Sequence, residues 1–251
     1  ELKYFKNADY SMKDYEKKSV NIKSLLNEKI RTYEPDFISF SFWGSHLHAE
    51  GEYQAYHKSV KIIENAKSKR SLYDCAIGVS GGKDSTFQAL TARDRFGLKC
   101  LLVNYQPENI TTVGERNIEN LKNLGFDVVT IRPNPQIMKK LIRYDFFKNL
   151  NPVKPTEFSL FSSTYIIAEK FHIPLIIQGE NPGLILGTRL TGVGTDSNAL
   201  KANELHTLSS GWEVYTEVEG VNKDDLFWFH YDRKKLEEMD ISGIWLNYFI
   251  K

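Results

Sequence analysis

The sequence contains few cysteines, no excess of either charge and no long apolar run. Only two of its 251 residues are cysteines, Cys75 and Cys100, and each lies in an apolar stretch typical of a buried strand. Neither belongs to a Cys-x-x-Cys pair, which argues against a disulfide scaffold and against a cysteine-based metal or redox motif. This cysteine usage indicates a reducing compartment.

The charge balance and the lack of a long apolar run disfavour a protein that binds polyanions by charge and a protein that spans a membrane. Lys and Arg total 33 against 32 Asp and Glu, which gives a formal net charge of +1, whereas binding polyanions by charge alone needs a clustered basic excess. No apolar stretch approaches the roughly 18 residues that span a membrane, and the first six residues are too polar for a signal peptide. We expect a cytoplasmic protein whose partner is neither a membrane nor nucleic acid.

The first part of the chain carries apolar residues at helical spacing. In residues 1–70 this pattern occupies the stretches 22–33 and 53–63 and predicts a helical N-terminal segment. His46 and His48 lie between the two stretches without a carboxylate or cysteine at ligand spacing. Two such histidines are more often surface or core residues than metal ligands.

Residues 71–251 alternate between short apolar runs and amphipathic stretches. The runs have the length and β-branched content of buried strands, and they are Cys75–Val79, Cys100–Tyr105, Val128–Ile131 and Pro174–Gln178. Helix starts are predicted at Thr111 or Thr112, Asn134 with Pro135, Thr156 and Asp232. This alternation predicts an α/β domain with a doubly wound, mainly parallel sheet, followed by a C-terminal extension.

The segment that follows the first predicted strand is the most informative. It has the sequence Ser80-Gly81-Gly82-Lys83-Asp84-Ser85-Thr86 and leads into a helical stretch. The glycines allow the backbone to approach a phosphate, and the N–H groups and helix N-terminus attract an anion. Lys83 adds a full charge, whereas Asp84 repels a phosphate unless it holds Mg²⁺ or positions a neighbouring group. The spacing is not that of a Walker A loop, which disfavours a kinase or GTPase.

This segment resembles the pyrophosphate-binding loop (PP-loop) of the N-type ATP pyrophosphatases, whose fold is adenine nucleotide alpha hydrolase-like. Those enzymes cleave ATP between the α- and β-phosphates, adenylate a carbonyl-type oxygen and let a nucleophile displace AMP. The resemblance implies ATP and Mg²⁺ as cofactors, with Lys83 and Asp84 catalytic and Asp84 the metal ligand. The implied cofactor-binding residues of the loop are Ser80, Gly81, Gly82, Lys83, Asp84, Ser85 and Thr86.

Three further stretches resemble the N-acetyl sugar amidotransferases of surface-polysaccharide biosynthesis. They are Lys154–Phe161, Ile173–Gly183 and Ile244–Lys251. Members of that family convert the acetamido group of a sugar to an acetamidino group with ammonia from a separate glutaminase. The resemblance implies an AMP-forming amidotransferase in lipopolysaccharide or glycan biosynthesis, with a glutaminase as partner and an acetamido sugar or sugar nucleotide as substrate. Zinc is doubtful, because the N-terminal cysteine cluster that family members often carry is absent from this sequence.

Other candidate site residues follow the later strands. Gly179, Glu180 and Asn181 come directly after the fourth strand and should lie at the same sheet edge as the loop. Glu180 is a catalytic and substrate-binding candidate that could hold Mg²⁺, orient ammonia or bind sugar hydroxyls. The alternative is an exposed glutamate beside a helix-capping asparagine.

Two more sets of residues are candidates for binding the nucleotide and the sugar. Asn104 and Tyr105, at the end of the second strand, and residues near Ile131 are candidates for adenosine, with ordinary strand ends as the alternative. Candidates for an acidic or nucleotide-linked sugar are Lys154, Arg189, Asp196 and Lys201, with solvated surface charges as the alternative.

The main alternative function is tRNA modification by a PP-loop enzyme, either lysidine-forming or thiolating. A thiolating enzyme needs reactive cysteines near the loop, and Cys75 and Cys100 look buried. A lysidine-forming enzyme should show a basic tRNA-binding face, for which the near-neutral charge offers little. Intact Lys83 and Asp84 weaken a third possibility, a nucleotide sensor without activity. Neither cysteine lies on a loop with a His and Glu partner, so ammonia is expected from outside.

Overall fold

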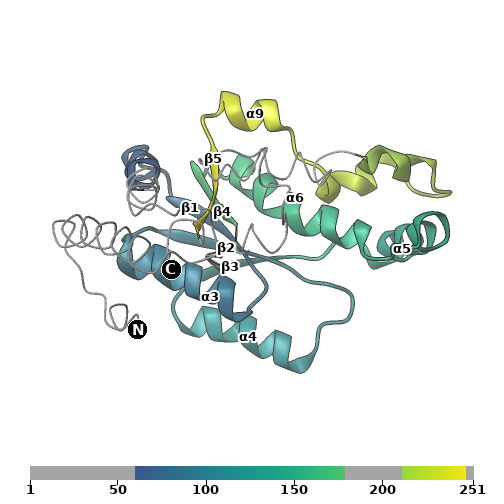
Figure 1. Ribbon diagram of the computed structural model, residues 1–251, viewed down its shortest axis with the longest axis horizontal. Helices are drawn as coiled ribbons and strands as arrows, with labels where there is room; N and C mark the ends of the chain where they lie inside the picture. The colour runs from purple at the N-terminus through teal and green to yellow at the C-terminus, as the bar shows by residue number, and fades with distance from the viewer. Residues whose placement is uncertain (1–59, 179–210, 247–251) are drawn as a thin grey trace, which may run out of the picture. The chain divides into compact units, whose positions relative to one another are not determined.

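The computed structural model describes residues 60–178 and 211–246 (Figure 1). The chain forms two compact units, Glu1–Lys58 and Ser59–Lys251, and every described residue belongs to the second. Residues 60–68 are helical. The end of the predicted helical stretch 53–63 falls within this helix. The rest of that stretch, the stretch 22–33, His46 and His48 lie outside the described residues, and the domain boundary at residue 70 stays a prediction.

Five strands of the described chain form a single parallel sheet. They are β1 (Cys75–Val79), β2 (Cys100–Tyr105), β3 (Asp127–Ile131), β4 (Leu175–Gln178) and β5 (Ser242–Trp245). Their spatial order is β3-β2-β1-β4-β5, and every neighbouring pair is parallel. The chain therefore changes direction across the sheet at β1, which is where ligands bind in sheets of this type.

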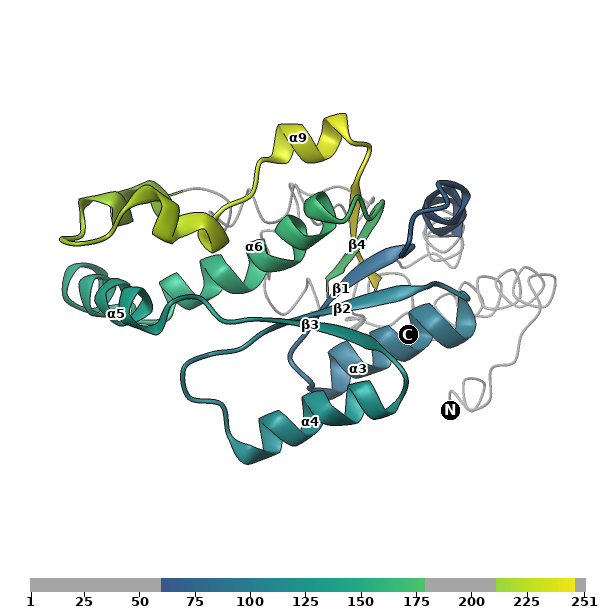
Figure 2. The ribbon, with the colours of Figure 1, turned by 180° about the vertical axis from the view of Figure 1, so that it is seen from behind.

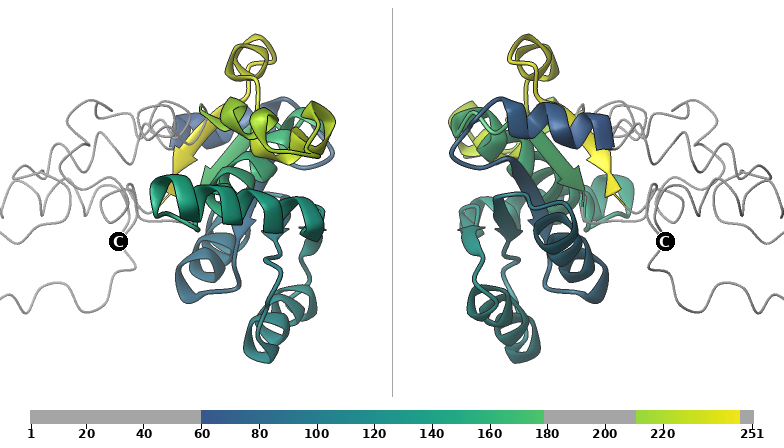
Figure 3. Two further views of the ribbon diagram at one scale, coloured as in Figure 1. Left: turned by 90° about the vertical axis from the view of Figure 1, so that its right-hand side faces the viewer. Right: turned by 90° about the vertical axis from the view of Figure 1, so that its left-hand side faces the viewer.

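Helices cover both faces of this sheet (Figures 2 and 3). On one face lie α3 (Lys83–Leu90), its π-helical continuation η2 (Thr91–Arg95) and α4 (Thr112–Asn123). The long helix α6 (Lys154–Lys170) lies on the other face and contacts β1, β2 and β4. The predicted doubly wound α/β fold is thus confirmed. None of the described helices has the length and apolar character needed to cross a membrane.

Most of the predicted helix starts are confirmed by their capping hydrogen bonds. The side chain of Thr111 accepts from the N–H of Gly114 at the start of α4. Asn134 caps α5 (Pro135–Asn149), and Asp232 caps α9 (Arg233–Glu238). The start predicted at Thr156 is wrong, because α6 begins two residues earlier at Lys154. No side chain caps it there, and Pro155 occupies the first turn, where an N–H is not needed.

A second apolar cluster lies outside the main core. It joins α5 and the start of α6 to two 3₁₀-helices, η4 (Trp212–Glu217) and η5 (Lys223–Phe229). Within it, the buried carboxylate of Asp145 on α5 accepts hydrogen bonds from the Tyr215 hydroxyl and from the Asn149 side chain. Burial and the neighbouring Asp145 both raise the pKa of Tyr215, so this phenol remains a donor.

We predict that Tyr215→Phe lowers the free energy of unfolding by about 1.5–3 kcal/mol, because a buried carboxylate loses a donor. Tyr144→Phe is the control, since among the described residues the Tyr144 hydroxyl accepts a hydrogen bond only from the exposed ammonium of Lys148; its effect should stay within about 0.5 kcal/mol. Urea unfolding of the two variants measures both values. Equal effects would contradict the role given to Asp145.

Candidate active site

The segment Ser80–Thr86 connects the carboxyl end of β1 to α3. Only the first three residues form the turn, since α3 begins at Lys83. Lys83, Asp84, Ser85 and Thr86 therefore belong to the first turn of the helix, where backbone N–H groups point out of the helix end. The arrangement is a strand, a glycine turn and a helix N-terminus, which is the local geometry that favours an anion.

Gly81 is the tightest point of the turn. Its φ of +76° lies in the left-handed region that side chains disfavour. A Cβ placed on Gly81 would lie 2.9 Å from the Cβ of Asn117 and 3.2 Å from the Cδ1 of Ile118, both on α4. The turn thus packs directly on α4, and only glycine fits without a shift of one or the other.

The helix end that faces the turn is open. Gly82 is the N-cap residue of α3, and no side chain of the described chain caps the helix there. The Gly82 N–H donates weakly to the Ser80 hydroxyl at 3.4 Å, and the buried Ser85 hydroxyl donates to the Gly82 carbonyl at 3.2 Å. The N–H groups of Lys83, Asp84 and Ser85 and the exposed Ser80 are therefore available to a ligand, whereas the Thr86 N–H already donates to the Gly82 carbonyl at 3.1 Å.

Lys83 and Asp84 are both exposed and form an ion pair, with 2.7 Å between Nζ and Oδ1. Ion pairs at such exposed positions are weak, so an incoming phosphate can separate the two groups at little cost. Asp84 then presents an oxygen ligand for Mg²⁺. Among the described residues there is no group of three His, Cys, Asp or Glu suited to a metal. A single carboxylate still fits Mg²⁺, which is commonly held by one or two carboxylates and the substrate phosphates.

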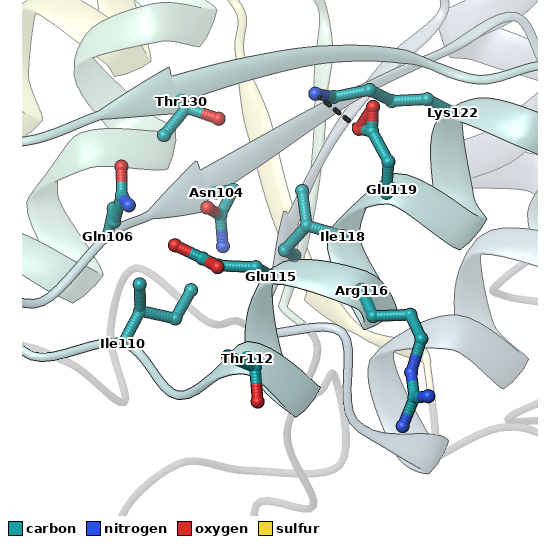
Figure 4. Close-up of a pocket in the computed structure, with 10 residues that line it drawn as sticks. All are labelled: Asn104, Gln106, Ile110, Thr112, Glu115, Arg116, Ile118, Glu119, Lys122 and Thr130. Atoms are coloured by element: carbon teal, nitrogen blue, oxygen red, sulfur yellow. Dashed lines mark ion pairs between the residues drawn. The ribbon is translucent and has the colours of Figure 1, made fainter.

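Asn104 connects the second strand to the start of the turn. It is buried near the end of β2, and its Nδ2 donates to the carbonyl of Val79, the last residue of β1, at 2.9 Å. A pocket of about 490 Å³ opens beside it, between α4 and the ends of β2 and β3 (Figure 4). This volume lies within the range of small-molecule sites.

The pocket combines neutral polar and charged groups with apolar walls. Its lining includes the amides of Asn104 and Gln106, the hydroxyls of Thr112 and Thr130, and the side chains of Ile110 and Ile118. Ile118 is also one of the two residues that contact Gly81. The turn and the pocket therefore share one wall, α4, and lie next to each other at the carboxyl edge of the sheet.

Two other predicted residues lie away from this pocket. Tyr105 follows Asn104 and so points to the opposite face of the sheet; it does not line the pocket, and burial raises its pKa to about 12. Lys154 is the first residue of α6, across the sheet from α4, and its ammonium lies 5.4 Å from the ring centre of Phe158. The remaining candidates fall outside the described residues: Gly179, Glu180, Asn181, Arg189, Asp196 and Lys201.

The sequence patterns did not single out Gln106, Thr130 or the charged residues of α4 that line the pocket. Thr130 falls only within the general expectation that residues near Ile131 contact adenosine. The available signal was the position of Gln106 directly after a buried strand, where ligands bind in parallel sheets. No periodicity distinguishes the pocket side of α4 from its solvent side.

Comparison with known proteins assigns no family. Neither a family model nor a curated protein matches the chain. Similar solved structures include an NMN synthetase from Francisella tularensis, with 17% identity, a TM-score of 0.41 and coverage of 75% of this chain and 84% of that one. An NH3-dependent NAD synthetase from Campylobacter jejuni has 13% identity, a TM-score of 0.40 and coverage of 75% and 91%.

A third similar structure is a predicted subunit of a tRNA methyltransferase from Methanocaldococcus jannaschii. It has 18% identity, a TM-score of 0.34 and coverage of 66% of this chain and 73% of that one. At these low TM-scores the three likenesses assign no reaction to this chain.

We predict that Gly81→Ala lowers the free energy of unfolding by about 2–4 kcal/mol, from the left-handed backbone and the collision with α4 together. Gly125→Ala is the matched control, because Gly125 has a φ of +86° but nothing within 4 Å of its Cβ position. It should cost only roughly 1 kcal/mol. Equal losses in urea unfolding would show that the turn does not pack on α4.

Proposed function

We propose that this chain is an ATP-dependent amidotransferase of the PP-loop type. It would cleave ATP between the α- and β-phosphates and transfer the adenylyl group to the oxygen of a sugar acetamido group. Ammonia would then displace AMP to give the acetamidino sugar. The observation that carries the proposal is the open N-terminus of α3 behind the Gly81-Gly82 turn, directly beside a nucleotide-sized pocket.

The turn suits a pyrophosphate that leaves as negative charge builds up on it. The N–H groups of the first turn of α3 are fixed in place before the reaction, so they stabilise this charge without reorganising. The ammonium of Lys83 adds to the same field once it leaves Asp84. Asp84 would hold Mg²⁺, which when bound supplies positive charge against the phosphates.

Amide chemistry explains why ATP is needed. An amide oxygen is a poor leaving group, and adenylation converts it into one. In the first step the amide oxygen forms a bond to the α-phosphorus while pyrophosphate leaves. In the second step ammonia adds to the imidate carbon and AMP leaves with the former amide oxygen. The part played by the protein is to position the reactants and neutralise charge.

The source of ammonia is expected to be another protein. A glutaminase of the cysteine type needs an accessible thiolate, and this sequence has only two cysteines. Both are free and buried in adjacent strands, with 3.5 Å between their sulfurs. Burial raises the pKa of Cys75, which further opposes thiolate formation. The same burial argues against a thiolating tRNA enzyme.

The substrate class is tested by incubating the protein with ATP, Mg²⁺, ammonium and sugar nucleotides that carry acetamido groups. The expected result is AMP with pyrophosphate, and a sugar product lighter by the difference between O and NH. Formation of ADP would contradict the PP-loop assignment. AMP formation that depends on RNA would contradict the sugar substrate and support a lysidine-type enzyme.

We predict that Lys83→Ala lowers the rate of AMP formation by roughly 100-fold, because one charge against the leaving pyrophosphate is lost. Lys234→Ala is the control, since Lys234 is an exposed residue of α9 outside the site. Chromatographic measurement of AMP compares the two variants with the wild type. Equal rates for Lys83→Ala and the wild type would show that Lys83 does not stabilise the leaving pyrophosphate.

A further inference from the structure

The pocket beside the turn contains a carboxylate that no neighbour in the described part of the chain neutralises. Four charged residues of α4 line this pocket: Glu115, Arg116, Glu119 and Lys122. Glu119 and Lys122 pair with each other at 2.8 Å. In Figure 4 the guanidinium of Arg116 points away from the pocket, whereas the carboxylate of Glu115 points into it, toward Asn104, Gln106 and Ile110.

The position of Glu115 along α4 relates it to the phosphate-binding turn. Ile118, which contacts Gly81, lies three residues further along the helix. Residues three apart share a helix face and differ by about 4.5 Å along the axis. In ATP the α-phosphate links the pyrophosphate, which the turn would hold, to the ribose, and the base follows the ribose. The Glu115 side chain lies one turn of α4 away from the segment that would hold the phosphates, and it is therefore placed to meet the ribose.

The backbone that carries Glu115 is held in place by its neighbours. The Gly114 N–H donates to the Thr111 hydroxyl at 3.1 Å, which caps the helix. A Cβ on Gly114 would lie 2.9 Å from the Cγ1 of Ile110, so the loop before α4 packs closely on its first turn. Glu115 thus projects from a fixed element.

The chemistry of a carboxylate selects the ribose over the other parts of the nucleotide. A carboxylate repels phosphates but accepts two hydrogen bonds from adjacent hydroxyls, as acidic residues do with ribose in dinucleotide-binding folds. We infer that Glu115 binds the 2′- and 3′-hydroxyls of the ATP ribose and so makes the site selective for ribonucleotides. This inference rests on the proposed function, because it takes the turn to hold the phosphates.

The test is calorimetric binding of ATP, 2′-deoxyATP and pyrophosphate, each with Mg²⁺, to the full chain. The wild type is expected to bind ATP about 10- to 100-fold more tightly than 2′-deoxyATP, the effect of one hydrogen bond to a charged group. In Glu115→Ala this ratio should fall to near one while pyrophosphate affinity is retained. Thermal melting checks that the variant is folded.

Glu238→Ala is the control, since it removes an exposed carboxylate from α9, whose residues do not line the pocket. It should keep the preference for ATP. The inference is overturned if the wild type binds both nucleotides equally, if Glu115→Ala keeps the preference, or if Glu238→Ala loses it as well. These outcomes leave the proposed function standing, whereas failure of the wild type to bind ATP and pyrophosphate at all would overturn both.

Discussion

The contact between Gly81 and α4 determines where the turn after β1 can lie. The turn has no room to move toward the helix, because even a single methyl group on Gly81 would collide with Asn117. On its other side it is bound to β1, whose last carbonyl accepts the hydrogen bond from Asn104. The open end of α3 is therefore held in one position relative to the pocket, which a site that aligns phosphates and ribose requires.

This constraint divides the site into two parts with different chemistry. The turn and the helix end offer N–H groups and the ammonium of Lys83, which suit an anion. Besides Arg116 and the Glu119–Lys122 ion pair, the pocket offers neutral amides, hydroxyls and the carboxylate of Glu115, which suit the uncharged part of a nucleotide. Because the carboxylate repels phosphates, the two parts together favour a single orientation of ATP. Of the sugar-site residues proposed from the sequence, Lys154 lies on α6 across the sheet, and the others, such as Glu180, lie outside the described residues.

The strands and helices that bring these parts together were largely predictable. The bounds of β1 and β2 match the prediction, since both are mainly apolar runs with polar residues on either side. β5 was not predicted as a strand, because its first residues, Ser242 and Gly243, carry little strand signal. α6 began earlier than expected because it lacks the side-chain cap on which the prediction relied.

The site was predictable only where local sequence determines local geometry. Ser80–Thr86 could be recognised because the strand, the glycines and the helix start are contiguous. The packing of α4 against the sheet determines both the contact of Gly81 with Asn117 and the position of Glu115. The sequence around these residues does not predict that packing. Tyr105 illustrates the reverse case: it is adjacent to Asn104 in sequence, but the alternation of a strand turns it to the other face.

The most direct measurement is an NMR titration of the chain, labelled with ¹⁵N at glycine, with pyrophosphate. The amide resonances of Gly81 and Gly82 are expected to shift as pyrophosphate binds, while those of Gly97 and Gly125, which precede β2 and β3 at the opposite edge of the sheet, should not. Unchanged Gly81 and Gly82 resonances at saturating pyrophosphate would contradict the central claim that this turn holds the departing phosphates of ATP.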